Sequence, residues 1–214
     1  MNVGNCMTKN PKTVAADVLV TEAQAMMRQA RIHRLPVVDK TGKLVGIVTD
    51  ADLRRASAPP ATSLDIYELH YLISKLKVDA VMTKKLFTVT EELPVEEAAR
   101  IMDDNRVAGL PVMRGNELVG IITESDLFRL FIGMFGVRHP GVRLTVLLPD
   151  KPGELAAVAS AIATAGGNIL SLATFDGEDP SNHFCTIKVE GIPKDKLVAA
   201  VSPHVLRVVD ALVS

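Results

Sequence analysis

The fold is decided by Gly46-Ile47-Val48-Thr49-Asp50-Ala51-Asp52, which the chain repeats as Gly120-Ile121-Ile122-Thr123-Glu124-Ser125-Asp126. Each copy runs a short apolar strand into a threonine and places an aspartate three residues later, where a new helix is expected. A hydroxyl and a carboxylate at this spacing can cap a helix, and the same two groups can hold the hydroxyls of a sugar. The repeated stretch alone leaves both readings open.

The similarity extends well beyond this stretch. Met7-Thr8 and Leu35-Pro36-Val37 recur 75 residues later as Met82-Thr83 and Leu110-Pro111-Val112. After a turn that is one residue shorter in the second copy, the shift falls to 74. Each copy is expected to contain a strand, a helix, a strand, a turn, a strand and a helix. Because a unit of roughly 55 residues has a marginal core, the two copies are expected to pack together.

A linker and one further helix are expected between the copies. Ala58-Pro59-Pro60-Ala61 has the composition of a linker, and Ser63 is a candidate N-cap. The apolar residues that follow recur at helical spacing up to Leu76. The expected boundaries are 1–60 for the first copy and 61–136 for the second copy with its leading helix.

Residues 141–214 show no trace of the repeat. Gly136 and His139-Pro140-Gly141 interrupt the last helix of the second copy and mark a boundary. The pattern beyond it predicts six elements in the order of a ferredoxin-like module: a strand over 143–148, a helix from Leu155 to Gly166, strands over 169–175 and 183–189, a short helix after Pro193 and a strand over 205–212. The predicted fold class is therefore α/β (α+β).

Composition excludes several classes of function. The net charge is −1, from 24 basic and 25 acidic residues, so neither nucleic acid nor an anionic membrane is an expected partner. No stretch approaches the roughly 20 apolar residues that cross a bilayer, and Met1-Asn2-Val3 does not open a signal peptide. A cytoplasmic protein is therefore expected.

Catalytic motifs are also missing from the sequence. The five histidines show no metal-ligand spacing, and there is no nucleophile elbow, phosphate-binding loop ending in Lys-Ser/Thr or dinucleotide fingerprint. Cys6 and Cys185 are far apart in the chain and are expected to be small core residues rather than ligands or nucleophiles. We expect no enzymatic activity, no catalytic cofactor and no metal site.

The two copies resemble a tandem of CBS domains, the pair called a Bateman module, over about residues 1–135. The resemblance rests on the Met-Thr start, the Leu-Pro-Val strand and the Gly-x-x-Thr-x-x-Asp end, each present twice. Residues 141–214 resemble an ACT domain, with Asp150-Lys151-Pro152-Gly153-Glu154-Leu155 as its first loop and Gly167-Asn168-Ile169 opening its second strand. The combination is similar to the acetoin utilization protein B type, although no residue here can be tied to acetoin.

The resemblance to CBS pairs implies an adenosine ligand, which is AMP, ADP, ATP or S-adenosylmethionine, in clefts between the copies. The aspartate would accept hydrogen bonds from the ribose hydroxyls, and charge-assisted hydrogen bonds are the stronger kind. The threonine would meet ribose or phosphate, near helix N-terminal N–H groups that favour phosphate. The expected residues of the first cleft are His33, Arg34, Thr49, Asp52, Phe87, Val107 and Ala108.

The second cleft is expected to be the weaker phosphate site. Its expected residues are Thr8, Lys12, Ile32, Thr123, Ser125 and Asp126. Where the first copy carries His33-Arg34, the second carries Ala108-Gly109 and so has no matching arginine. The hypothesis is that the second cleft binds weakly, or takes a less charged adenosine compound.

The resemblance to ACT domains implies an amino-acid site at a dimer interface. The matching positions are Asp150, Gly153, Leu155, Asn168 and Ile169. Asp150 stands where an asparagine is often found, and its charge would repel a ligand carboxylate while attracting an α-amino group. A purely structural, dimerising ACT domain is the alternative.

Two non-catalytic functions follow from these resemblances. In the first, the protein is a regulatory sensor of an adenosine ligand that modulates a metabolic partner enzyme. In the second, it is a structural or interaction subunit that regulates a partner protein without physiological small-molecule binding. Either function fits a homodimer assembled through the CBS and ACT domains.

Overall fold

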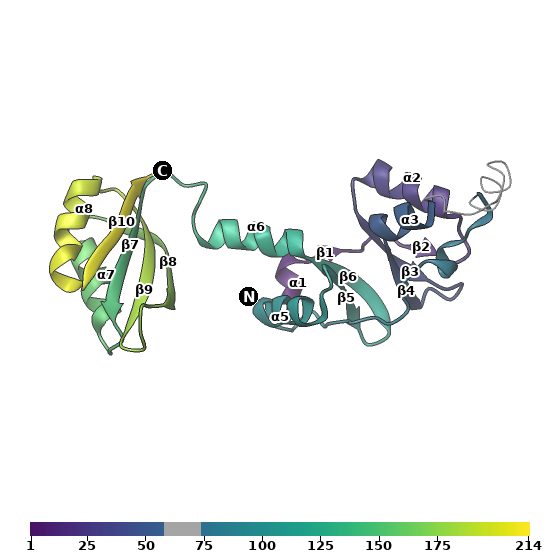
Figure 1. The fold of residues 1–214 in the computed structure, drawn as a ribbon, viewed down its shortest axis with the longest axis horizontal. Helices are drawn as coiled ribbons and strands as arrows, with labels where there is room; N and C mark the ends of the chain where they lie inside the picture. Colours follow the sequence, from purple (N-terminus) through teal and green to yellow (C-terminus); the bar gives the residue numbers. More distant parts are fainter. Residues whose placement is uncertain (58–73) are drawn as a thin grey trace. The chain divides into compact units, whose positions relative to one another are not determined.

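The computed structural model describes residues 1–57 and 74–214. It divides into two compact units, Met1–Leu127 and Phe128–Ser214. The first unit, coloured purple to teal in Figure 1, holds the two sequence copies up to Leu127. The second unit holds the rest of the second copy's last helix and the C-terminal module, which is coloured green to yellow. The linker and most of the helix expected after Ser63 lie outside the described residues.

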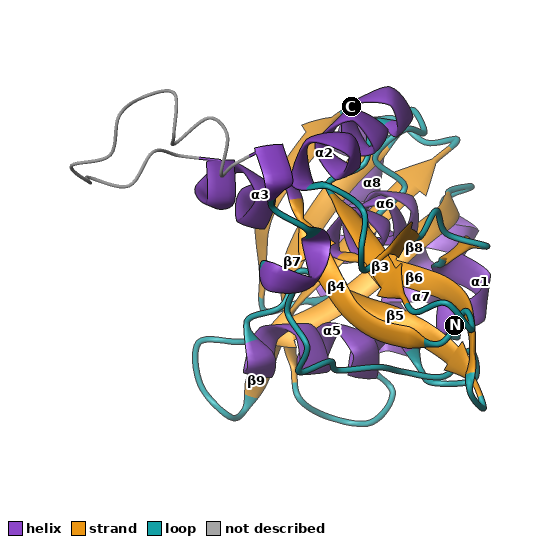
Figure 2. Ribbon diagram, turned by 90° about the vertical axis from the view of Figure 1, so that its right-hand side faces the viewer, coloured by secondary structure: helices purple, strands orange, loops and turns teal. Residues whose placement is uncertain are grey.

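The first copy forms a three-stranded sheet with two helices. Its elements are β2 (Val14–Ala15), α2 (Val20–Ala30), β3 (Arg34–Val38), β4 (Leu44–Thr49) and α3 (Asp50–Ser57). β2 runs parallel to β3, and β3 and β4 form the predicted antiparallel hairpin. Figure 2 shows α2 and α3 beside each other, and the two helices contact one another. The stripe of Val20, Ala23 and Met27 on α2 is buried, as its helical spacing predicts.

The second copy repeats this arrangement. Its elements are η1 (Val78–Ala80), α5 (Val95–Asn105), β5 (Gly109–Arg114), β6 (Glu117–Thr123) and α6 (Glu124–Met134). The strand expected at its start is reduced to a single bridge between Val89 and Val112. Val95, Ala98 and Met102 are buried at the positions equivalent to the α2 stripe.

The leading segments of the two copies are exchanged. After α1 (Val3–Cys6), strand β1 (Thr8–Lys9) pairs with β6 of the second copy, and Thr83 exchanges backbone hydrogen bonds with Ile47 of the first copy at 2.9 and 3.0 Å. A Cβ atom at Gly46 would lie 2.5 Å from Sδ of Met82, and one at Gly120 would lie 2.2 Å from Sδ of Met7. The repeated glycines therefore let each Met-Thr segment cross closely over the other copy.

The C-terminal module has the predicted β-α-β-β-α-β order. Its elements are β7 (Val142–Pro149), α7 (Glu154–Thr164), β8 (Asn168–Asp176), β9 (Asn182–Glu190), α8 (Lys194–Val201), η2 (Ser202–His204) and β10 (Arg207–Val213). The strands form one antiparallel sheet in the order β10-β7-β9-β8. Figure 1 shows α7 and α8 on the same face of this sheet, which confirms the ferredoxin-like topology.

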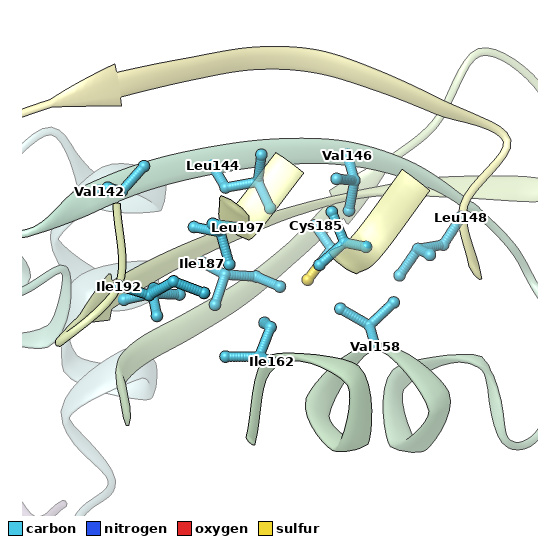
Figure 3. Packing of buried hydrophobic residues seen from close by; sticks show 12 residues of the cluster. Val142, Leu144, Val146, Leu148, Val158, Ile162, Cys185, Ile187, Ile192 and Leu197 are labelled. Carbon is cyan, nitrogen blue, oxygen red and sulfur yellow. The ribbon is translucent and has the colours of Figure 1, made fainter. Parts of the chain in front are cut away.

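One hydrophobic core fills the space between this sheet and its helices (Figure 3). Alternate residues of β7 and β9 point toward the helices, as expected for strands with one covered face. The fully buried members are Leu144, Val146, Leu148, Val158, Ile162, Cys185, Ile187, Val189, Leu197 and Val201. The module therefore has a core of its own.

The two cysteines differ in exposure. Cys185 is 0% exposed within the core, as predicted, and burial raises the pKa of its thiol to about 11. The prediction for Cys6 is wrong: Cys6 is only half-buried, and its Sγ lies 3.1 Å from Sδ of Met1. The prediction rested on the equivalent residue, Val81, which is itself only half-buried and packs against the core of the first copy without being part of it.

This difference predicts which thiol reacts. At pH 8 about one in a thousand Cys185 side chains would be thiolate, and the thiolate is the nucleophile. We expect Ellman's reagent to modify one thiol per native chain rapidly and both thiols in guanidinium chloride. Two rapidly reacting thiols in the native protein, or a persistent signal after Cys6→Ser, would contradict the burial of Cys185.

None of the described helices is long and apolar enough to cross a membrane.

Candidate functional site

Each repeated Thr-x-x-Asp sequence forms a helix cap. Thr49 donates its backbone N–H and its hydroxyl to Oδ2 of Asp52 at 3.0 and 2.6 Å, and the N–H of Asp52 donates to Oγ1 of Thr49 at 3.2 Å. In the second copy, Thr123 donates the same two groups to Oδ2 of Asp126 at 2.8 and 2.6 Å. Both copies therefore form a Thr–Asp cap, and in the first copy the bond from Asp52 back to Thr49 also satisfies a backbone donor at the start of α3.

The cap bonds do not occupy every hydrogen-bonding atom of the Asp52 carboxylate. A carboxylate has two oxygens, and both bonds from Thr49 go to Oδ2 of Asp52, while Oδ1 has only a distant contact, 3.8 Å, with the Arg55 guanidinium. The Asp52 side chain is 21% exposed, whereas Asp126 is 4% exposed. Capping and hydroxyl binding are thus compatible at Asp52, which keeps one accessible carboxylate oxygen.

A cavity of about 310 Å³ opens beside the first cap. Its lining residues come from both copies: Arg34, Ile47, Thr49, Asp52, Thr83, Lys85, Leu86, Phe87, Arg106, Val107, Ala108, Gly109 and Pro111. Six of the seven residues expected for the first cleft are among them, and only His33, which is exposed, is not. The structure therefore brings these six residues together around one space.

The side chains that line the cavity are of two kinds, charged and apolar. Three cationic side chains line it, from Arg34, Lys85 and Arg106, together with the Asp52 carboxylate. Phe87 supplies an aromatic ring, and Nζ of Lys85 lies 5.9 Å from the centre of that ring, within the range of a cation–π contact. A ligand with phosphate, hydroxyl and flat apolar parts matches these groups.

Some lining residues were not expected from the sequence. Thr83 could have been found, because it is the equivalent of Thr8 at the repeat shift of 75, and Thr8 was expected in the second cleft. Lys85 and Arg106 could not have been found in this way, because their equivalents, Asn10 and Arg31, were not expected site residues. Arg106 is the C-cap residue of α5, where the backbone is left-handed, and its side chain lines the cavity.

Arg34 occupies a place between the copies. A Cβ atom at Gly109 would lie 2.2 Å from Nη1 of Arg34, so the guanidinium lies directly over the first residue of β5. Burial lowers the pKa of Arg34, while the negative charges of Glu124 and Asp126 act to raise it. The arginine of the first copy therefore lies within electrostatic reach of the second copy's carboxylates.

Of the residues expected for the second cleft, Thr8 lies near the other cap. Thr8 pairs with Ile121 on β6, two residues before Thr123. Lys12 and Ser125 are exposed, and Ile32 is half-buried. Asp126 is the buried member of this set, so its carboxylate is less open than that of Asp52.

A single chain does not bring the five expected amino-acid-site residues together. Asp150, Gly153 and Leu155 follow the end of β7, which pairs with Asn182 at the start of β9. Asn168 pairs with Glu190 at the other end of β9. Eight residue steps along a strand span about 27 Å. Both halves of such a site can meet only if a second copy of the module contributes one of them.

Some polar groups of that expected site already have partners within the chain. Asn168 donates its side-chain amide to Oε1 of Glu190 at 2.8 Å. Asp150 is exposed, and its Oδ1 lies 3.7 Å from Nδ1 of His183. Gly153 adopts a left-handed conformation with φ 97° at the start of α7, which explains a glycine there. Leu155 is 37% exposed, and Ile169 packs against the module's core.

The CBS-domain family model matches residues 3–59 and 78–133, more than half of the 214 residues. The chain belongs to the CBS-domain family. Its two sequence copies are tandem CBS domains, and residues 140–211 match the family of TTHA0829-like ACT domains. The predicted fold, a CBS pair followed by an ACT domain, is confirmed.

Relatives of the CBS pair occur alone and inside enzymes. A CBS domain-containing protein of Dictyostelium discoideum is 37% identical over 131 residues, which cover 61% of this chain and 90% of the relative. Inosine-5′-monophosphate dehydrogenase of Methanocaldococcus jannaschii is 36% identical over 122 residues, which cover 56% of this chain but only 22% of that enzyme. The similarity to the enzyme is confined to this small part of its length.

Solved structures share the CBS pair. A CBS domain pair crystallised with 5′-methylthioadenosine and S-adenosyl-L-methionine is 29% identical, with a TM-score of 0.52, and the match covers 65% of this chain and 98% of that one. A putative acetoin utilization protein of Vibrio cholerae is 28% identical, with a TM-score of 0.54, covering 64% and 95%. CBSX2 in complex with AMP is 28% identical, with a TM-score of 0.51, covering 64% and 98%.

Within the described parts of this CBS and ACT chain, no group of three or more His, Cys, Asp or Glu side chains could hold a metal ion.

Proposed function

We propose that the CBS pair of this chain senses an adenosine ligand, which is AMP, ADP, ATP or S-adenosylmethionine, in the cavity beside Asp52. The observation that carries the proposal is the composition of that cavity: one accessible carboxylate, three cations and an apolar wall in about 310 Å³. Small-molecule sites of this kind combine mainly apolar walls with a few placed polar groups.

Each part of the ligand has a matching part of the cavity. Oδ1 of Asp52 accepts from the ribose hydroxyls while Oδ2 stays in the cap. Arg34 and Arg106 offer guanidinium groups suited to bidentate phosphate contacts. Adenine lies against Phe87, Val107 and Ala108. Support from relatives comes from the CBS pairs solved with AMP and with S-adenosyl-L-methionine.

A thermal-shift panel tests this proposal. A ligand at 100 times its Kd stabilises the folded state by about 2.7 kcal/mol, enough to raise Tm by several degrees for a unit of this size. We expect at least one of AMP, ADP, ATP and S-adenosylmethionine to do so, with guanosine monophosphate as the matched control. Equal, negligible shifts for all of these compounds would refute adenosine sensing.

The proposed role is regulatory and non-catalytic. Ligand binding in the CBS pair would modulate a metabolic partner enzyme in the cytoplasm, and the protein would act as a homodimer through its CBS and ACT domains. The similarity to the acetoin utilization protein of Vibrio cholerae supports an acetoin-related partner. Prolonged incubation with ATP should leave the nucleotide intact.

The ACT domain is proposed to bind an amino acid between two copies of the chain. Asp150 and Asn168 are at opposite ends of β9, so a complete site needs a partner's Asn168. Calorimetric titration with the twenty amino acids, at concentrations where the protein is dimeric, tests the site. Absence of heat throughout would leave the ACT domain with a purely structural role.

The alternative function is an interaction subunit that needs no small molecule. It is favoured by the exposed apolar side chains on and beside edge strand β10, where Leu206, Leu212 and Val213 are 59%, 56% and 73% exposed. Edge strands with apolar side chains are ready places for pairing. Capture of the same partner with and without ATP would favour this function over sensing.

A further inference from the structure

We propose that Arg34 is a charge shared by the two clefts of the CBS pair, and that a phosphate in the first cleft withdraws it from the second. The proposal rests on the proposed function, because it requires that adenosine compounds bind in the clefts. It adds a coupling between them, and it names the residue that carries the coupling.

The geometry places the Arg34 side chain across the boundary between the copies. Arg34 opens β3 and pairs with Thr49, while its equivalent, Gly109, opens β5 and pairs with Thr123. Nη1 of Arg34 lies 2.2 Å from the place of a Cβ atom at Gly109. A side chain at position 109 would therefore collide with the guanidinium, so the glycine leaves room for a single arginine at this place.

The charges around Arg34 belong to both copies. On one side it lines the cavity that also contains Asp52. On the other side, the negative charges of Glu124 and Asp126 act on its guanidinium. Both acidic residues lie in the first turn of α6. Asp126 is 4% exposed, and a buried carboxylate needs a compensating charge or hydrogen bonds. Arg34 supplies positive charge to the second cleft while it lines the first.

A phosphate in the first cavity competes for this charge. Arg34 then turns toward the phosphate, and Asp126 keeps its cap bonds from Thr123 but loses the nearby cation. With less positive charge beside it, the carboxylate is a stronger acceptor for the ribose hydroxyls of an uncharged adenosine compound. A second phosphate, in contrast, finds less positive charge in the second cleft. Linkage makes each effect reciprocal.

Calorimetry with two probes measures the coupling. AMP carries the phosphate, and 5′-methylthioadenosine is an uncharged adenosine compound. The second cleft alone is titrated with 5′-methylthioadenosine in two states: wild-type protein saturated with AMP, and Asp52→Ala protein without AMP (Asp52→Asn if the alanine variant unfolds). We expect at least five-fold tighter binding in the AMP-saturated protein, the lower end of typical coupling.

Two variants remove Arg34 from its shared place. Arg34→Gln deletes the charge, and Gly109→Ala puts a methyl group where the guanidinium lies. Each variant is made in the AMP-saturated protein and in the Asp52→Ala protein. Each should abolish the five-fold difference in 5′-methylthioadenosine affinity. Arg54→Gln is the matched control, because Arg54 is 67% exposed and pairs with Asp50 on α3 away from the cavity lining; it should keep the difference.

Each outcome decides between the proposals. Equal affinities in the two states, or a difference that survives both Arg34→Gln and Gly109→Ala, would overturn the coupling and leave adenosine binding in place. If neither AMP nor 5′-methylthioadenosine binds the wild-type protein, the proposed function fails and the coupling fails with it.

Discussion

Replacing Asp52 by alanine is expected to weaken AMP binding about 100-fold. The proposed contacts are hydrogen bonds from two ribose hydroxyls to Oδ1, and a hydrogen bond to a charged group contributes about 1.5–3 kcal/mol. A loss of about 3 kcal/mol corresponds to roughly two powers of ten in Kd. Isothermal titration calorimetry of the wild-type and variant proteins measures the change directly.

The cap complicates this variant, and the repeat provides its control. Asp52 also accepts two hydrogen bonds from Thr49, so its removal is expected to cost about 1 kcal/mol of stability. Asp126→Ala removes the equivalent bonds from Thr123 in the other copy. We expect a similar loss of stability from Asp126→Ala with no weakening of AMP binding. Equal losses of affinity from both variants would show that the two clefts contribute equally to AMP binding.

Replacing Leu144 by alanine is expected to destabilise the ACT domain by about 2–5 kcal/mol. Leu144 is 0% exposed in the core between β7 and the two helices (Figure 3). The substitution removes buried methyl groups and leaves a cavity, and both effects lower the free energy of unfolding. Urea unfolding followed by circular dichroism measures the change.

Leu212→Ala is the matched control for the core variant. Leu212 lies on the same sheet, opposite Arg143, and is 56% exposed. The same chemical change at this site should alter stability by less than about 0.5 kcal/mol, as is usual for surface substitutions. Similar losses from Leu144→Ala and Leu212→Ala would mean that Leu212 is covered, as it would be in a dimer formed through β10.

The sequence predicts most of the fold because repetition and periodicity are local properties. The shift of 75 residues identifies two copies, and the spacing of Val20, Ala23 and Met27 identifies the buried face of α2. The order of elements after residue 141 suffices for a ferredoxin-like topology, since few arrangements of such elements are stable.

The exchange of leading segments is not visible in the sequence. Met7 and Met82 look like the first residues of their own copies, yet each lies against the glycine of the other copy. Backbone hydrogen bonds between residues far apart in the chain, such as those of Thr83 with Ile47, decide this arrangement. The burial of Cys6 is a different case: Cys6 and its equivalent Val81 are both half-buried, and the apolar residue type of Val81 did not by itself imply a place in the core.

For the candidate site, the sequence by itself determined the chemical groups: the two Thr-x-x-Asp stretches, Arg34 in only one copy and Phe87, Val107 and Ala108 in the other. Only the tertiary structure decided that Oδ2 of Asp52 caps α3 and that Lys85 and Arg106 join the same cavity. It also placed Arg34 over Gly109, where the charge of Asp126 acts on its guanidinium. The physical reason is that a side chain's charge and hydrogen-bonding capacity belong to its residue type, whereas burial and neighbours depend on how distant segments pack.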